Sequence, residues 1–159
     1  MNPLAWLLGL LLPACGGFGA DRVAAPRPLD IAHFDRPSTP NTALAAPVGT
    51  GIRPDIVVPE YPVPASRLLA AIERVAGSEP RTWRLDPAGD TGQTARYVVR
   101  SAIWNFPDIV SVEVLPRRAD ASTFALYSRS VYGRSDFGIN LRRITAWIAA
   151  LNATLKAER

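Results

Sequence analysis

The spacing of apolar residues in the second half of the chain predicts two helices. Four apolar side chains recur with the period of a helix that buries one face: Leu68, Leu69, Ile72 and Val75. Pro64 and Gly77 suit the two ends of this helix. A second stripe with the same period stands near the C-terminus and comprises Ile144, Trp147, Ile148, Leu151 and Leu155. We expect Ser135 or Asp136 to cap this last helix, because both side chains accept hydrogen bonds from backbone N–H groups.

Between the two helices the pattern changes to the two-residue alternation of strands. The expected strands are 81–86, 95–106, 109–115 and 122–131, and turn-forming residues, including those at 86–90, separate them. The connections are short, so neighbouring strands should pair antiparallel. The sheet face opposite the helices is expected to carry Arg84, Arg96, Arg100, Trp104, Phe106, Tyr127 and Arg129.

These elements predict an α+β fold for residues 64–159. Both helices should cover one face of a four-stranded antiparallel sheet, giving a two-layer domain with the order α-β-β-β-β-α. An extended Pro-rich arm, residues 21–63, precedes it, and nine Pro stand from residue 26 to residue 64. A flexible linker is one interpretation of the arm. Because the arm keeps many apolar residues, we expect part of it, near 55–63, to pack on the domain.

Residues 1–20 are expected to be a signal or lipoprotein-type leader, or a membrane anchor. They contain no charged side chain, and their apolar run ends at Pro13, which is short for a membrane-spanning helix. The segment Leu12-Pro13-Ala14-Cys15-Gly16 resembles a bacterial lipobox, in which a peptidase cuts before a Cys that carries lipid. Cys15 is therefore the candidate lipidation site. An export leader without lipid and a cytosolic chain are the alternatives.

Composition narrows the chemistry that this chain can support. Its 159 residues are 48% hydrophobic, which suits one folded domain rather than a disordered chain. A single Cys and a single His argue against a metal centre, and no cofactor is expected. A net charge of +4 is too small to indicate nucleic-acid binding. His33, the one imidazole, lies in the arm and is interpreted as an ordinary surface residue.

Three segments of the chain carry a family resemblance. They are RPSTPN at 36–41, RSAIWNFPDIVSVEVLP at 100–116 and YSRSVYGRSDFGINLRR at 127–143. Together they resemble the bacterial domain of unknown function 1499 family over about residues 34–151. The resemblance implies no activity, because the family is uncharacterised. It does imply that the Pro-rich arm belongs to the domain.

The last of these segments has a structural and a functional interpretation. In the structural one, glycines allow a tight turn and an acid caps the helix, and the residues concerned are Gly133, Ser135, Asp136, Gly138 and Asn140. In the functional one, cations and aromatic rings share one exposed face and bind a partner. The candidate binding residues are Arg96, Arg100, Trp104, Tyr127, Arg129 and Arg134.

These observations lead to three hypotheses about function. The first is a non-enzymatic domain, anchored to the membrane of the cell envelope through its N-terminus and facing the periplasm, or exported. It would bind an anionic lipid, a small molecule or an envelope protein. The second is a structural or assembly protein of the envelope without a ligand, and the third is an enzyme of unrecognised type. A pocket lined by Arg100, Trp104 and Arg129 would favour binding, whereas an outer face covered by the arm would favour a scaffold.

Overall fold

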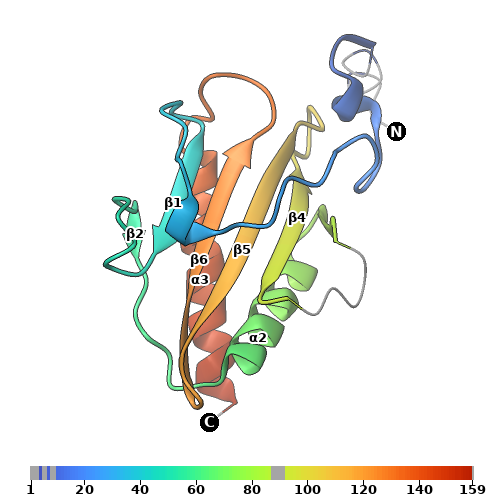
Figure 1. Cartoon of the computed structure of the whole chain (residues 1–159). Helices are drawn as coiled ribbons and strands as arrows, with labels where there is room; N and C mark the ends of the chain where they lie inside the picture. The colour runs from blue at the N-terminus through green and yellow to red at the C-terminus, as the bar shows by residue number, and fades with distance from the viewer. Residues whose placement is uncertain (1–3, 5–6, 8–9, 87–91, 159) are drawn as a thin grey trace.

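The computed structural model describes residues 4, 7, 10–86 and 92–158 (Figure 1). The strands are β1 (Thr42–Ala46), β2 (Ile56–Val57), β3 (Thr82–Arg84), β4 (Thr94–Arg100), β5 (Pro107–Arg118) and β6 (Ala121–Ser130). The helices are α2 (Ala65–Ser78) and α3 (Ile139–Ala157), together with two short 3-10 turns, η1 (Pro13–Gly16) and η2 (Ile31–His33). Of the turn expected at 86–90, residues 87–90 lie outside the described residues.

The strands form one six-stranded sheet in the order β2-β1-β6-β5-β4-β3. The α+β class and the two helices are confirmed, but the prediction of four strands is wrong, because the Pro-rich arm supplies β1 and β2. β1 pairs antiparallel with β6, and β2 pairs parallel with β1. Pro40 and Pro47 flank β1 without interrupting it, so its five residues keep the backbone donors that a strand needs. β1 thereby covers an edge of β6 that would otherwise be open.

The strand expected at 95–106 ends earlier than its pattern indicated. β4 stops at Arg100, and residues 101–106 form a turn in which the Ser101 N–H donates to the Phe106 carbonyl at 2.9 Å. Asn105 has a left-handed backbone with φ of 58°, which extended strand geometry does not allow. Trp104 therefore lies on a turn at the end of the sheet instead of on its face.

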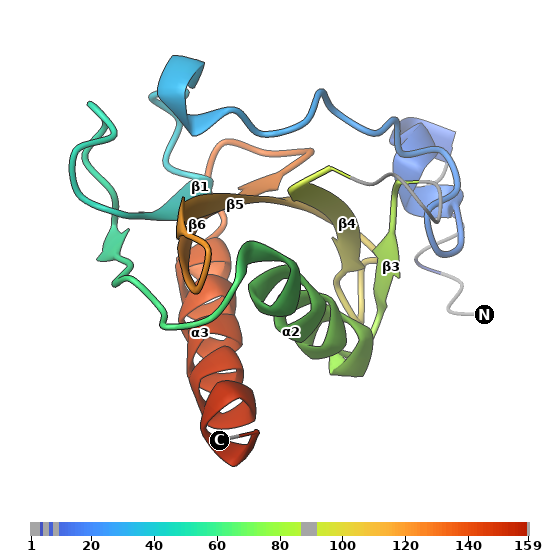
Figure 2. The same cartoon turned by 60° about the horizontal axis from the view of Figure 1, so that its bottom comes forward.

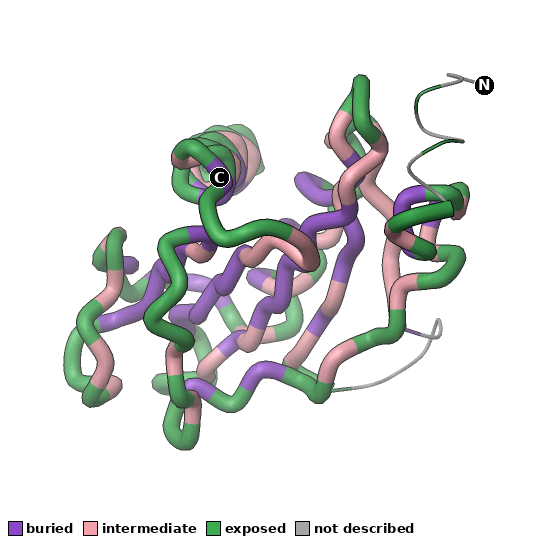
Figure 3. Tube along the Cα trace, turned by 90° about the horizontal axis from the view of Figure 1, so that it is seen from above, coloured by how far each residue is buried: buried purple, intermediate pink, exposed green. Residues whose placement is uncertain are grey.

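Both helices cover the same face of the sheet, as expected (Figure 2). The core between them and the sheet holds apolar residues of β1, β4, β5 and β6 as well as of α2 and α3. Trp147 of α3 packs edge-on against Tyr97 of β4, with ring centroids 5.8 Å apart. Figure 3 shows the buried part of the chain running along these central strands, with exposed segments around them.

The opposite face of the sheet, here called the outer face, is covered by extended chain. Residues 21–35, here called the strap, cross it from the side of β4 to the side of β1 (Figures 1 and 2). A second, smaller apolar cluster forms where the strap meets β1 and β6, and it comprises Leu29, Ile31, Leu44, Ala46, Ala125 and Tyr127. The expected two-layer arrangement is thus incomplete, because the strap makes a third layer. No helix within the described residues has the length and apolar character needed to cross a bilayer.

Candidate functional site

The outer face carries the alternate residues of β4, β5 and β6 that the sequence pattern predicted. Arg96 of β4 stands opposite Ser111 of β5, and Ser111 stands opposite Tyr127 of β6. The residues between them, such as Tyr97 and Val110, belong to the helix-facing core. The phase of β4, β5 and β6 was therefore correct. The phase of β3 was wrong, because Arg84, expected on the outer face, stands opposite Tyr97 and forms an ion pair with Glu73 of α2 on the helix side. The remaining question is what covers the outer side chains.

Arg100 is buried, which corrects the expectation that it is exposed on the outer face. Only 2% of its surface is accessible. Its guanidinium donates hydrogen bonds at 2.5 to 3.3 Å to the backbone carbonyl oxygens of Ala14, Gly19, Asp21 and Asn105. Burial lowers the pKa of Arg100 from its ordinary value. All four acceptors are backbone carbonyl groups, and none is a carboxylate. Because three of them belong to residues 14–21, Arg100 clamps this segment to the end of β4.

Other outer-face side chains hold successive residues of the strap. Arg96 forms an ion pair with Asp86 and donates a hydrogen bond to the Pro26 carbonyl oxygen. The Glu113 carboxylate accepts the backbone N–H of Ile31 at 2.6 Å, and burial raises the pKa of Glu113. Tyr127 is buried under the ring of Phe34, with centroids 4.7 Å apart. Much of the predicted cationic and aromatic face therefore binds the chain's own strap.

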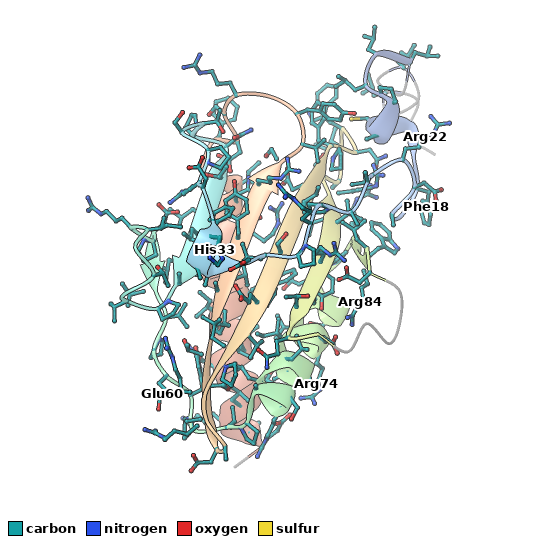
Figure 4. The ribbon with its side chains drawn as sticks, in the orientation of Figure 1. Phe18, Arg22, His33, Glu60, Arg74 and Arg84 are labelled. Carbon is teal, nitrogen blue, oxygen red and sulfur yellow. The ribbon has the colours of Figure 1, made fainter. Side chains whose placement is uncertain are left out.

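Between the strap and the sheet lies a partly open cleft of about 610 Å³. Strap residues 26–30 and 33–35 line one wall, and Ser111, Tyr127 and Arg129 line the other. Figure 4 shows His33 on the strap, in front of the sheet. Of the six candidate binding residues, only Tyr127 and Arg129 line this cleft. Arg134 is exposed on the loop after β6, and Trp104 lies on the β4–β5 turn.

The cleft combines apolar surface with charges of both signs. Leu29 and Phe34 supply part of the apolar wall, and Arg27 and Arg129 supply cations. His33 Nδ1 lies 2.8 Å from Asp30 Oδ2, and this contact lowers the pKa of Asp30.

Tyr127 belongs to the sheet wall of the cleft, but its hydroxyl is not open to a ligand there. Its hydroxyl oxygen is buried and has no partner at hydrogen-bond geometry in the described part of the chain, although the Thr42 side chain lies near it. No three His, Cys, Asp or Glu side chains among the described residues gather closely enough to hold a metal ion.

A smaller cavity of about 170 Å³ lies on the helix side, between α2, β3 and β4. It is lined in part by Glu73, Arg84 and Tyr97, and Arg84 forms an ion pair with Glu73. The Tyr97 hydroxyl and the Arg84 Nε are buried without a partner among residues that the structure describes. Burial strongly raises the pKa of Tyr97. This cavity is too small for the amphiphilic ligands that the sequence suggested.

The segment between β6 and α3 is held by a buried hydrogen-bond network. α3 begins at Ile139, three residues after Asp136, and Gly138 with φ of 75° precedes it. Asp136 nevertheless stabilises the helix start, because its two carboxylate oxygens accept the N–H groups of Gly138 at 3.0 Å and Asn140 at 2.7 Å. Ser135 is exposed and accepts the Phe137 N–H at 3.4 Å through its hydroxyl.

Asn140 is the centre of this network and is fully buried. Its Nδ2 donates to the Asn41 carbonyl oxygen at 2.9 Å, while Asn41 Nδ2 donates to the Gly133 carbonyl oxygen at 2.7 Å. Asn140 Oδ1 accepts hydrogen bonds from Ser128 and from Arg143. These contacts agree with the structural interpretation of the motif.

Arg143 completes the network and was missed by the sequence analysis. It donates to Asp108 Oδ2 at 2.6 Å, and both side chains are largely buried. The sequence carries only a weak indication of this role for Arg143. The helical period places Arg143 at the edge of the buried face of α3, and the adjacent Arg142 makes the two arginines hard to distinguish from sequence.

Cys15 is fully buried and belongs to the segment 14–21 that Arg100 holds against the end of β4. Asn105 Nδ2 donates to the carbonyl oxygens of Cys15 at 2.5 Å and Gly17 at 2.9 Å. Burial raises the pKa of the Cys15 thiol. The candidate lipidation site therefore lies against the folded domain rather than on a free tail.

Comparison with known proteins adds one match. The model of a family described as Protein of unknown function (DUF1499) matches residues 34–151. This range includes the sheet wall of the cleft, the Asn41–Asn140 network and both helices up to Leu151. No curated protein matches the chain.

Proposed function

The chain belongs to the DUF1499 family of proteins of unknown function, and we propose that it is a non-enzymatic envelope domain that binds a small anionic amphiphile between the strap and the sheet. The strap covers much of the outer face, and of Arg100, Trp104 and Arg129 only Arg129 lines the cleft, which by itself favours a scaffold. The observation that carries the binding proposal is that the strap leaves a cleft of about 610 Å³ beneath it. Pockets for small molecules usually measure about 300–1,000 Å³ and combine apolar walls with a few polar groups.

The lining of the cleft favours a ligand with one acidic group and an apolar body. Arg27 and Arg129 come from opposite walls and suit a carboxylate or a phosphate monoester. Leu29 and Phe34 offer apolar contact. Asp30 and Asp35 also line the cleft. These carboxylates would repel a ligand with several negative charges, whereas a ligand with one negative charge can place it beside an arginine.

The envelope location rests on the sequence of the leader. Its uncharged apolar run and its resemblance to a lipobox support anchoring through Cys15. Replacing Cys15 by Ser is the direct test, since serine fits the buried position but carries no thiol for lipid. We expect the variant to leave the membrane fraction of cells that retain the wild type. Equal retention of both proteins would contradict lipidation and favour a plain hydrophobic anchor.

The contact between His33 and Asp30 in the cleft suggests an alternative, a hydrolytic enzyme. His33 and Asp30 resemble the base and the orienting acid of a catalytic triad, and Ser111 lines the same cleft. No hydrogen bond joins Ser111 to His33 in the described structure, and the His33 side chain is largely exposed. A triad needs the nucleophile within reach of its base, so the arrangement supports binding better than hydrolysis.

Titration of the full chain with dodecanoate, followed by calorimetry, tests the binding proposal. Dodecanol serves as the uncharged comparison. Arg129→Gln should weaken dodecanoate binding about tenfold, because one charge-assisted pair is worth roughly 1.5–3 kcal/mol. Arg134→Gln is the matched control, since this exposed arginine does not line the cleft, and should leave the affinity unchanged.

Two outcomes would replace the proposal with one of the other hypotheses. If wild type, Arg129→Gln and Arg134→Gln bind dodecanoate equally weakly, and native mass spectrometry of the extracted protein finds no bound small molecule, a structural role is favoured. If the chain hydrolyses p-nitrophenyl dodecanoate, and both Ser111→Ala and His33→Ala abolish turnover, the domain is an enzyme.

A further inference from the structure

Phe137 occupies a conformation that packing inside the domain does not explain. Its backbone is left-handed with φ of 54°, which is rare for a bulky residue, and 86% of its surface is exposed. An aromatic ring that stays in water while its backbone is strained gains nothing from the fold itself. Such outliers point from geometry to function.

The loop around Phe137 is built to hold this ring outward. Asp136 accepts the Gly138 N–H on one side, and Arg142 donates to the Phe137 carbonyl oxygen at 3.0 Å on the other. Asp136 is itself buried and fixed by the Asn140 N–H. The ring therefore projects from an ordered turn rather than from a loose one.

The leader contacts this loop and the neighbouring β4–β5 turn at one end of the sheet. The Ala14 N–H donates to the Tyr132 hydroxyl at 3.2 Å, and Asn105 binds the Cys15 carbonyl oxygen. Figure 1 shows the N-terminal segment, the turn and the loop after β6 at the same end. The turn, the loop and the first turn of α3 expose large apolar side chains there, namely Trp104, Phe137, Ile139 and Leu141.

Exposed cations accompany these apolar side chains. Arg134 and Arg142 flank Phe137 and are both exposed, and Figure 4 shows Arg22 beside the N-terminal segment. The acid of the loop, Asp136, is buried and already accepts two N–H groups. The opposite end of β6 differs, because the β5–β6 hairpin there exposes Arg117, Arg118 and Asp120 and no large apolar side chain.

We infer that the end of the sheet that carries Phe137, Trp104 and residues 15–21 is a surface for contact with an anionic lipid bilayer. Aromatic rings suit the interface between headgroups and acyl chains, and arginines beside them attract anionic lipid. A bilayer fits better than a protein partner, because the apolar side chains sit at the tips of separate segments near Cys15, the proposed point of membrane attachment, whose carbonyl oxygen Asn105 binds. The clamp on residues 14–21 then fixes the orientation of the domain on the membrane. This inference shares the membrane location with the proposed function but is independent of the cleft.

The single native Cys allows a direct test with a site-specific fluorescent label. In a Cys15→Ser background, Phe137→Cys carries the environment-sensitive dye NBD, and Asp120→Cys on the opposite hairpin carries it in the matched control. The full chain is mixed with phosphatidylcholine vesicles with and without phosphatidylglycerol. We expect NBD emission at position 137 to rise severalfold and shift to the blue with anionic vesicles, and emission at position 120 to stay as in buffer.

The comparison of the two positions separates this surface from binding by the leader alone. If vesicle-bound protein gives the same emission at positions 137 and 120, the leader holds the domain without a preferred face and the inference is wrong. Phe137→Ser should leave the melting temperature unchanged, because the ring is exposed, yet weaken partition onto anionic vesicles about tenfold. Unchanged partition of Phe137→Ser would likewise overturn the inference. Neither result depends on whether the cleft binds dodecanoate.

Discussion

The side-chain amide of Asn140 donates a hydrogen bond, 2.9 Å long, to the backbone carbonyl oxygen of Asn41. The same carbonyl oxygen accepts the Ser130 N–H at 3.1 Å. One buried asparagine thus joins the residue before β1 to the end of β6 and to the first turn of α3. The contact explains why the RPSTPN segment and the C-terminal motif occur in one domain although 99 residues separate their asparagines.

Asn140→Ala should destabilise the domain by about 2–3 kcal/mol. The substitution removes the acceptor of the Ser128 hydroxyl proton and one of the two acceptors of Arg143 Nη1, which still donates to Ser128 Oγ at 3.0 Å, and it removes the amide that donates to the Asn41 carbonyl oxygen. Hydrogen bonds lost from buried polar groups are costly. Urea unfolding followed by circular dichroism measures the loss. Asn152→Ala in the same helix is the control and should lose under about 1 kcal/mol, because Asn152 is exposed and accepts one hydrogen bond, from Tyr61. Equal losses would contradict a central role for Asn140.

Arg100→Met should release residues 14–21 from the end of β4. Methionine fills much of the space but cannot donate to the four carbonyl oxygens that the guanidinium binds. We expect a loss of about 2–4 kcal/mol in unfolding free energy and faster tryptic cleavage after Arg22. Arg134→Met at an exposed position should change the stability by under about 0.5 kcal/mol. Unchanged cleavage in the Arg100 variant would show that other contacts hold this segment.

Asp136→Ala should cost about 1–2 kcal/mol, because the start of α3 loses the carboxylate that accepts its N–H groups. Asp136→Ser should restore only part of this loss. A single hydroxyl oxygen on a shorter side chain cannot serve Gly138 and Asn140 at once. Thermal unfolding of the two variants decides the matter, and full recovery by serine would mean that one of the two hydrogen bonds contributes nothing.

Tyr97→Phe should leave the domain as stable as the wild type or raise its stability by up to about 1 kcal/mol. The Tyr97 hydroxyl is buried without a partner at hydrogen-bond geometry within the described structure, so its removal abolishes a desolvation cost. Tyr61→Phe is the matched control, since the Tyr61 hydroxyl donates to Asn152 at 2.9 Å. It should lose about 0.5–1.5 kcal/mol. A clear destabilisation of Tyr97→Phe would indicate an ordered water or ligand in the adjoining cavity.

Glu113→Gln should change how stability depends on pH. Burial raises the folded-state pKa of Glu113 above its usual 4.5, so the folded protein holds this proton more tightly than the unfolded chain. Ionisation therefore removes stability from the wild type as pH rises above about 4.5, and the removal is complete above the raised folded-state pKa. Gln cannot ionise, and its amide oxygen can still accept the Ile31 N–H. The variant should match the wild type at low pH and exceed it at neutral pH in urea unfolding. A stability difference that does not vary with pH would contradict this assignment.

Periodicity along the chain was enough to predict the helices and the alternating faces of the central strands, and three contiguous motifs were enough to identify the family. Each of these depends on residues within one element or on short contiguous segments. Leu68 to Val75 and Ile144 to Leu155 repeat with the helical period, and in β4 and β6 every second residue faces the same side. The placement of Arg96, Arg100, Tyr127 and Arg129 on the outer face followed from that alternation.

Only the tertiary structure decided what covers that face and which polar groups meet. Alternation tells toward which side Arg100 points, but its burial depends on the carbonyl oxygens of residues 14–21, about 80 positions away. β1 was hidden in a Pro-rich arm, because five residues without Pro form a strand only when the edge of β6 is there to pair with them. The Asp108–Arg143 pair and the cleft under the strap likewise require the sheet to be assembled first. Local patterns fix the direction of a side chain, whereas its partners come from long-range packing that no local pattern contains.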